Sequence, residues 1–183
     1  MRWFWKWYLW SEDWKVEGSF PYHLKKMVII VAPHTHWKDF ILGVAVRSAY
    51  RFTYVKFLGK QELFKPPFGF IFRWLGGTPV DRRNNNNLVE AVVQKFNDSE
   101  SLVIALSPEG TRKKVEKLRT GFYHIARQAG VPIMMVGFDF KNHKVIFDEP
   151  FMTTENEAAD FERITNFYRP IEGKIPEQGL MHF

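Results

Sequence analysis

Short apolar runs that alternate with helical patterns constrain the fold of this chain more than any other feature. The clearest example is residues 28–31, a β-branched run that predicts a buried strand. Pro33, which cannot donate to a strand ladder, closes it, and a helical pattern follows over residues 37–50. Further strands are predicted at residues 14–16, 53–58, 101–106, 131–138 and 144–147, and further helices at residues 88–96, 122–128 and 155–168.

This alternation predicts an α/β fold, with a mixed, largely parallel sheet flanked by helices on both faces. A length of 183 residues suits a single domain. Gly59 is expected to end a strand, Asn87 to open a helix, and Gly130 to end a helix in the left-handed conformation. A glycine turn and a short strand are expected within residues 76–83.

The start of the chain is unusually aromatic. Residues 2–10 carry four tryptophans together with Arg2 and Lys6. Because indole rings favour the headgroup level and cations favour anionic lipid, residues 1–12 are predicted to form a membrane-contacting segment ahead of a domain over residues 13–183. The alternative is a helix or extended arm packed on that domain. A net charge of +6 also favours anionic partners, whereas no nucleic-acid-binding signature is present.

Two titratable side chains follow the strand at residues 28–31. His34 and Asp39 are five positions apart, which in a regular helix would separate them by about 140°. They can meet if His34 lies in the strand-to-helix turn and Asp39 in the first helical turn. Asp39 could then accept a hydrogen bond from one imidazole nitrogen and leave the other nitrogen as a base.

Charged residues also follow the later strands. Loops at one edge of an open α/β sheet converge on a crevice, which would bring Arg82 and Arg112 toward His34. Guanidinium groups present forked donors suited to phosphate. Glu109 could orient one of these arginines or hold a loop backbone through its amides, and a purely structural ion pair is the alternative.

Four sequence blocks together resemble one family. His34-Thr35-His36-Trp37-Lys38-Asp39 is similar to the HX4D box of the glycerolipid acyltransferases. The second, third and fourth blocks of that family resemble residues 77–82, 107–112 and 131–133, with Ser107 standing where phenylalanine is usual. All four occur in the family's order across roughly residues 14–140, so the chain is identified as a member of the lysophosphatidic acid acyltransferase (PlsC-like) family.

The resemblance implies an O-acyltransferase that moves a fatty acyl group from acyl carrier protein or coenzyme A to the hydroxyl of a lysophospholipid such as 1-acylglycerol-3-phosphate. His34 would be the general base and Asp39 would orient it. The acceptor phosphate would be bound by a second group of residues: Arg82, Glu109, Gly110, Thr111 and Arg112. The resemblance implies no metal and no cofactor beyond the acyl thioester. We also expect the protein in the cytoplasm, peripherally on the inner face of an anionic membrane.

Several alternatives accompany this interpretation. The acceptor could be an amine-bearing or non-phosphate lysolipid, or the chain could be a non-catalytic lipid-binding protein on the same fold. A metal hydrolase is a weaker rival, because His34, His36 and Asp39 match a zinc motif poorly. The apolar residues 63–75 predict two short helices, either in the core or forming an acyl-chain groove or second membrane contact.

Overall fold

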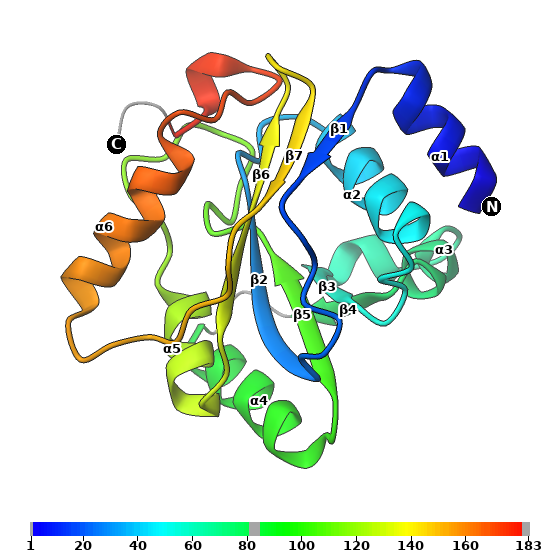
Figure 1. Ribbon diagram of the computed structural model, residues 1–183. Coiled ribbons are helices and arrows are strands. Elements are labelled where there is room, and N and C mark those ends of the chain that lie inside the picture. Colours follow the sequence, from blue (N-terminus) through cyan, green and yellow to red (C-terminus); the bar gives the residue numbers. More distant parts are fainter. Residues whose placement is uncertain (1, 81–84, 181–183) are drawn as a thin grey trace.

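The computed structural model describes residues 2–80 and 85–180. Within them the chain forms one seven-stranded sheet in the order β1-β7-β6-β2-β5-β3-β4 (Figure 1). All neighbouring strands are parallel except β6 and β7, which are antiparallel. The strands are β1 (Lys15–Glu17), β2 (Lys26–Ala32), β3 (Lys56–Lys60), β4 (Gly77–Val80), β5 (Leu102–Leu106), β6 (Ile133–Asp139) and β7 (Lys144–Phe147).

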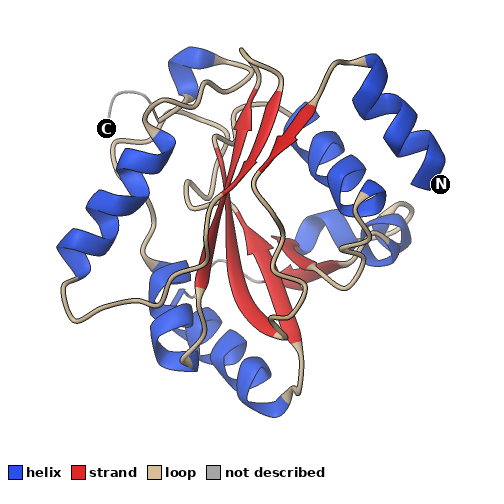
Figure 2. Ribbon diagram, viewed as in Figure 1, coloured by secondary structure: helices blue, strands red, loops and turns tan. Residues whose placement is uncertain are grey.

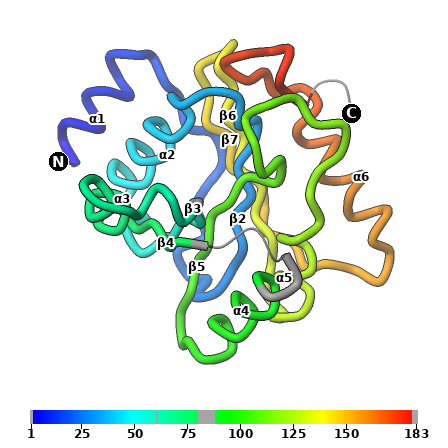
Figure 3. The backbone as a smooth tube through the Cα atoms, turned by 180° about the vertical axis from the view of Figure 1, so that it is seen from behind, coloured from blue at the N-terminus to red at the C-terminus, as the bar shows by residue number. Residues whose placement is uncertain are grey.

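Helices cover both faces of this sheet, as Figure 2 shows. The helices α1, α2 and α3 lie on one side and α4, α5 and α6 on the other (Figures 1 and 3). Their bounds are α1 (Arg2–Ser11), α2 (Lys38–Ala49), α3 (Gly69–Trp74), α4 (Asn85–Asp98), α5 (Gly121–Ala129) and α6 (Glu157–Tyr168), with short 3₁₀ turns η1 (Gln61–Phe64) and η2 (Pro176–Gln178). The predicted mixed, largely parallel α/β fold is therefore confirmed.

The position of β2 in the middle of the sheet explains why most of its sequence is a continuous apolar run. Its residues Val28 and Ile30 pack into a core cluster shared with α4, α5 and α6. Its residues Met27 and Ile29 point the other way, into a cluster shared with α1 and α2. Side chains alternate across a strand, so a strand buried on both faces needs an apolar residue at every position. This double burial makes β2 the rigid support for the loop that follows it.

Of the three residues predicted to begin or end a helix or strand, two do not lie at the boundary of an element. Gly59 is inside β3. A Cβ at Gly59 would lie 2.9 Å from the ring of Phe64, so the glycine permits a close approach instead of ending the strand. Asn87 lies inside α4, which begins at Asn85, because a run of asparagines offers several equivalent starting positions. Gly130 does end α5 in the left-handed conformation, with φ 62° and ψ 37°.

The predicted pair of short helices at residues 63–75 is present as η1 and α3. Its interpretation as part of the core is wrong for most of its large side chains. Phe64 is buried, but Phe68, Phe70 and Trp74 are 65%, 68% and 64% exposed. The segment therefore places a group of aromatic rings on the surface. Its helix α3 lies on the same side of the sheet as α1 and α2 (Figures 1 and 3).

Candidate active site

Two loops meet at the carboxyl edge of the sheet because β2 and β5 are neighbours. The strands run parallel, with Ile30 paired with Leu106 close to the end of each strand. Residues 33–37, which lead into α2, and residues 107–112 therefore leave the sheet side by side. Ligand crevices of open α/β sheets form at such an edge.

His34 and Asp39 meet in the way that their spacing predicted. The imidazole Nδ1 of His34 lies 3.3 Å from Oδ2 of Asp39. His34 belongs to the turn and Asp39 to the first turn of α2. The His34 side chain is 29% exposed, whereas that of Asp39 is 1% exposed. A base needs access to a substrate, and its orienting group needs only contact with the base, so this difference in exposure fits the two predicted positions.

A second contact fixes the carboxylate of Asp39. The backbone N–H of His36 donates to Asp39 Oδ2 over 2.7 Å. Asp39 Oδ1 is buried and has no hydrogen-bond partner among the described residues. With Nδ1 of His34 directed at this carboxylate, Nε2 is the nitrogen left to act on another molecule. The pair thus has the arrangement of a base held in one tautomer by a buried acid.

Glu109 reaches the same turn from the neighbouring loop. The backbone N–H of His34 donates to both carboxylate oxygens of Glu109, over 2.8 and 3.0 Å. Ser107 Oγ donates to Oε2 of Glu109 over 3.0 Å. Of the alternatives open for Glu109, the structure shows the backbone contact, and none of the ion pairs recorded for the described residues includes Glu109. The carboxylate ties the β5 loop to the backbone of the histidine.

Glu109 is only 1% exposed, and this burial is the largest influence on the pKa of its carboxyl group. Desolvation raises the pKa of this carboxyl to about 7, against the lowering effect of the hydrogen bonds from the His34 N–H and the Ser107 hydroxyl. The charge next to the His34 backbone therefore changes near neutral pH. Ser107 supplies one of the donors that favour the charged form.

The rest of the loop after β5 is folded back on itself. Gly110 has φ 67°, in the left-handed region that favours glycine. Thr111 Oγ1 accepts a hydrogen bond from the backbone N–H of Lys113. Arg112 is exposed. The structure thus brings Glu109 to His34 and places Gly110, Thr111 and Arg112 next along the same loop, whereas Arg82 lies outside the described residues.

The sequence patterns did not identify a group of positioning residues near the end of the chain. The buried Thr35 accepts a hydrogen bond at Oγ1 from the backbone N–H of Ile175, over 3.1 Å. The side-chain amide of Gln178, assigned from its hydrogen-bond network, donates to the backbone oxygens of Thr35 and Arg112. One segment therefore holds both loops of the site. No spacing rule could have found it, since 140 positions separate Thr35 from Ile175 and the contacts of Gln178 are also between distant parts of the chain.

Metal-ligating groups and membrane spans were searched for in the described residues. In residues 2–80 and 85–180 no three His, Cys, Asp or Glu side chains are grouped so that they could hold a metal ion. His36 points its ring at Trp37, with 5.4 Å between the ring centroids, and accepts a hydrogen bond at Nδ1 from the backbone N–H of Lys38. None of the helices described here has the length and apolar character required to span a bilayer.

Comparison with protein families gives one match over most of the chain. The family model described as Acyltransferase matches residues 13–139. The curated 1-acyl-sn-glycerol-3-phosphate acyltransferase of Haemophilus influenzae is 34% identical over an alignment of 95 residues, and the match covers 48% of this chain and 39% of that protein. The protein of the same name from Salmonella typhimurium is 36% identical over 95 residues, covering 48% of this chain and 38% of its own length. The chain thus spans about two fifths of the length of the curated relatives it matches.

A solved structure shares the fold. The crystal structure of the 1-acyl-sn-glycerophosphate (LPA) acyltransferase PlsC from Thermotoga maritima matches with a TM-score of 0.53 and 18% identity. The match covers 89% of this chain and 74% of that one. It supports the α/β architecture, on which the two loops at the carboxyl edge of β2 and β5 are placed.

Proposed function

Because the chain belongs to the acyltransferase family, as its four sequence blocks predicted and the match over residues 13–139 confirms, we propose that it acylates a lysophospholipid. The acyl group would move from an acyl thioester, carried by coenzyme A or acyl carrier protein, to the free hydroxyl of an acceptor such as 1-acylglycerol-3-phosphate. The observation that carries the proposal is the partly exposed imidazole of His34, 3.3 Å from the buried carboxylate of Asp39.

In the proposed reaction, Nε2 of His34 removes the proton of the acceptor hydroxyl while its oxygen attacks the thioester carbonyl carbon. Asp39 stabilises the imidazolium that forms. The tetrahedral intermediate then collapses, the carbon–sulfur bond breaks, and the thiolate leaves and takes the proton from His34. A thiol has a pKa of about 8.5, so its thiolate departs readily without strong acid assistance. The chain contains no cysteine, and direct attack on the thioester needs no covalent enzyme intermediate.

The acceptor phosphate is proposed to bind at the loop after β5 together with Arg82. Arg112 follows Glu109 by three positions and is exposed, so its guanidinium is available to a phosphate oxygen. Glu109, Gly110 and Thr111 would shape this part of the site through the contacts described above. Phosphate bound here would lie next to the turn that carries His34.

Replacing Arg82 by Ala is expected to raise the Michaelis constant for the lysophospholipid by about tenfold or more, because one charge-assisted hydrogen bond to phosphate is lost. The Michaelis constant for the acyl thioester should change little. Steady-state kinetics with each substrate varied in turn measures both. Arg127→Ala, which removes an exposed guanidinium that pairs with Glu155 on another face, is the matched control. Equal increases for both substrates would contradict the assignment of Arg82.

The membrane contact is proposed to involve α1. Trp3, Phe4, Trp7 and Trp10 are 80%, 56%, 58% and 77% exposed. Helix α1 lies on the same side of the sheet as α3, which carries further exposed aromatic residues (Figures 1 and 3). Exposed aromatic rings beside cations are typical of segments that lie in the membrane interface. We place the protein peripherally on the inner, cytoplasmic face, where the acyl donors and the lipid acceptor can both reach it.

Within α1 the tryptophans differ in their surroundings. Trp5 is half-buried and packs against the core cluster that includes Leu9 and Ala49, so it belongs to the domain and not to the exposed surface. Trp3 and Trp7 therefore test the contact without disturbing the core.

Replacing Trp3 and Trp7 together by Ala is expected to weaken binding to phosphatidylcholine vesicles by about tenfold or more, because two indole rings leave the interface. Thermal unfolding should be nearly unchanged, since both rings are exposed. Vesicle sedimentation measures the binding. Met152→Ala, which removes another exposed apolar side chain, should bind like the wild type. If the double variant also sediments like the wild type, α1 is not the contact.

The acyl transfer itself is tested by supplying each thioester donor with a panel of lysolipids, phosphate-bearing and amine-bearing. The expected result is thiol release that depends on a phosphate-bearing lysolipid. Release that is highest with an amine-bearing acceptor would change the proposed substrate. Lipid binding without any thiol release would favour the non-catalytic alternative.

A further inference from the structure

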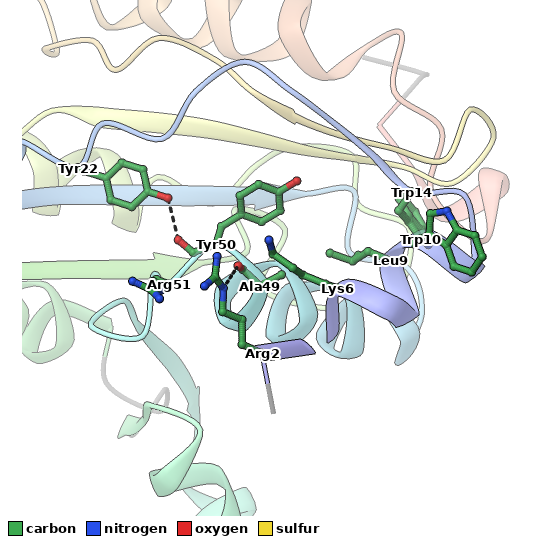
Figure 4. Close-up of a pocket in the computed structure, with 9 residues that line it drawn as sticks. All are labelled: Arg2, Lys6, Leu9, Trp10, Trp14, Tyr22, Ala49, Tyr50 and Arg51. Carbon is green, nitrogen blue, oxygen red and sulfur yellow. Dashed lines mark hydrogen bonds between the residues drawn. The ribbon is translucent and has the colours of Figure 1, made fainter. Parts of the chain in front are cut away.

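A cavity of about 650 Å³ lies between α1 and the end of α2 (Figure 4). It is at the opposite end of α2 from Asp39, which is in that helix's first turn. A helix of 12 residues is about 18 Å long, so the cavity is distinct from the site around His34. Nothing in the proposed acyl transfer uses it.

Three cations line this cavity. Figure 4 shows the nitrogen atoms of Arg2, Lys6 and Arg51 around the last residues of α2. Within residues 2–80 and 85–180 none of the three forms an ion pair, and no acidic side chain is among the lining residues. Like charges gathered without counterions create a positive potential that attracts an anion.

The C-terminal end of α2 neutralises only part of the positive charge of these three residues. Arg2 Nε donates to the backbone oxygen of Ala49 over 3.3 Å, and Tyr22 Oη donates to that of Tyr50 over 2.7 Å. These contacts satisfy carbonyls of the last helical turn. The C-terminal end of a helix carries the equivalent of roughly half a negative charge, so three cations leave a large positive excess.

Arg51 holds its position at a conformational cost. The backbone N–H of Phe52 donates to the carbonyl of Arg47, which makes Arg51 the residue just beyond the Tyr50 cap of a Schellman motif. Its φ is 63°, in the left-handed region where glycine is the usual residue. Arginine therefore occupies a backbone position that glycine would adopt at a lower cost.

The surroundings of the cavity indicate a lipid as the occupant. Trp10, which is 77% exposed, contributes to its lining, and the exposed rings of Trp3 and Trp7 lie on the same helix. Indole rings take up positions at the headgroup level of a bilayer, which would set the cations at the depth of lipid phosphates. We propose that this cavity binds the phosphate of an anionic phospholipid headgroup and fixes the orientation of the protein on the membrane.

This proposal rests on the membrane contact of α1 and not on the acyl-transfer chemistry. Its test is binding of the Lys6→Ala, Arg51→Gly double variant to phosphatidylcholine vesicles with and without phosphatidylglycerol. Each cation near an anionic surface contributes about a fivefold factor in affinity. The expected result is a loss on the order of thirtyfold on phosphatidylglycerol-containing vesicles, with binding to pure phosphatidylcholine retained.

The two substitutions are chosen so that neither should destabilise the folded protein. Glycine adopts the left-handed conformation freely, so Arg51→Gly alone should unfold at the same temperature as the wild type or at a higher one. Lys6→Ala places a strong helix former on the exposed side of α1. The matched charge control is Lys25→Ala with Lys95→Ala. Both lysines are exposed, and Lys95 lies in α4, at the far end of the molecule from α1 (Figures 1 and 3).

The outcomes separate the possible causes. A much larger loss in the cavity variant than in the charge control supports the proposal. Equal losses in the two variants would assign the anionic preference to net charge and overturn it, as would wild-type binding by the cavity variant. A third outcome concerns a free anion. If inorganic phosphate raises the unfolding temperature of the wild type but not of the cavity variant, and the two proteins bind vesicles equally, then the cavity binds a free anion and the proposed lipid occupant is wrong. A wild type that binds vesicles in this pattern but releases no thiol would contradict only the proposed acyl transfer.

Discussion

Replacing His34 by Ala is expected to lower the rate of acyl transfer by roughly 10²- to 10⁴-fold, the contribution of a positioned general base. The variant has no group that can take the hydroxyl proton as the oxygen attacks. Asp39 cannot take over the role, because its side chain is 1% exposed and lies behind the imidazole. The measurement is thiol release from the acyl donor at saturating lysophospholipid.

The His34→Ala variant should remain folded and should still bind lipid. Its side chain is partly exposed, and the His34 backbone N–H that donates to Glu109 is kept. The Asp39 carboxylate also keeps the hydrogen bond from the His36 N–H. Unchanged thermal unfolding and vesicle binding therefore accompany the expected loss of rate. A rate within a factor of about three of the wild type would remove His34 from the mechanism.

Asp39→Asn provides the comparison that separates orientation from proton transfer. The amide can accept the hydrogen bond from the His36 N–H, but it carries no charge to stabilise the imidazolium. A loss smaller than that of His34→Ala, with the Michaelis constants little changed, is the result expected of an orienting group.

Much of the fold could be predicted because its signals are local. A strand buried on both faces has apolar residues at successive positions, as β2 does from Met27 to Ala32, and that run is visible in the sequence. The meeting of His34 with Asp39 was equally predictable, since a strand, a turn and the first turn of a helix fix both positions within a few residues. The end of α5 at Gly130 was predictable for a similar local reason, because a residue that ends a helix in the left-handed conformation is usually glycine.

The contacts that the sequence left open or did not indicate join distant parts of the chain. The His34–Glu109 contact spans 75 positions, and the sequence allowed either this backbone contact or an ion pair. The contacts of Thr35 with Ile175 and Gln178 depend on tertiary packing that no periodicity reports. Surface placement is also hard to predict: the aromatic residues at 63–75 suit a core by composition, yet Phe70 and Trp74 lie on the surface.

Replacing Glu109 by Ala is expected to lower the free energy of unfolding by about 3 kcal/mol, measured by urea denaturation at about pH 5. The substitution removes a buried hydrogen-bond acceptor, the Glu109 carboxyl group. The His34 N–H and the Ser107 hydroxyl both donate to this side chain, and without it both donors are left unsatisfied. Because the His34 N–H is one of them, transfer activity should fall as well.

Glu109→Gln is the matched variant, because its amide oxygen can accept from the His34 N–H while its NH₂ group donates to Ser107. It should remain close to the wild type in stability at about pH 5. The two proteins should then diverge as the pH rises, since burial raises the pKa of Glu109 from 4.5 to about 7. The folded state retains a proton that the unfolded state releases between these values, so this carboxyl contributes its full stability below 4.5 and loses it as the pH rises through 7.

A shift of this size corresponds to about 3 kcal/mol, so the wild type should lose about that much stability relative to Glu109→Gln between pH 4.5 and 7. Above that range the difference should be constant. Urea denaturation of both proteins across the range measures it, and taking the difference removes the contributions of all other titrating groups. Parallel stability curves would mean that Glu109 is ionised throughout. The hydrogen bonds from His34 and Ser107 would then outweigh its desolvation, and the charge beside the His34 backbone would be permanent.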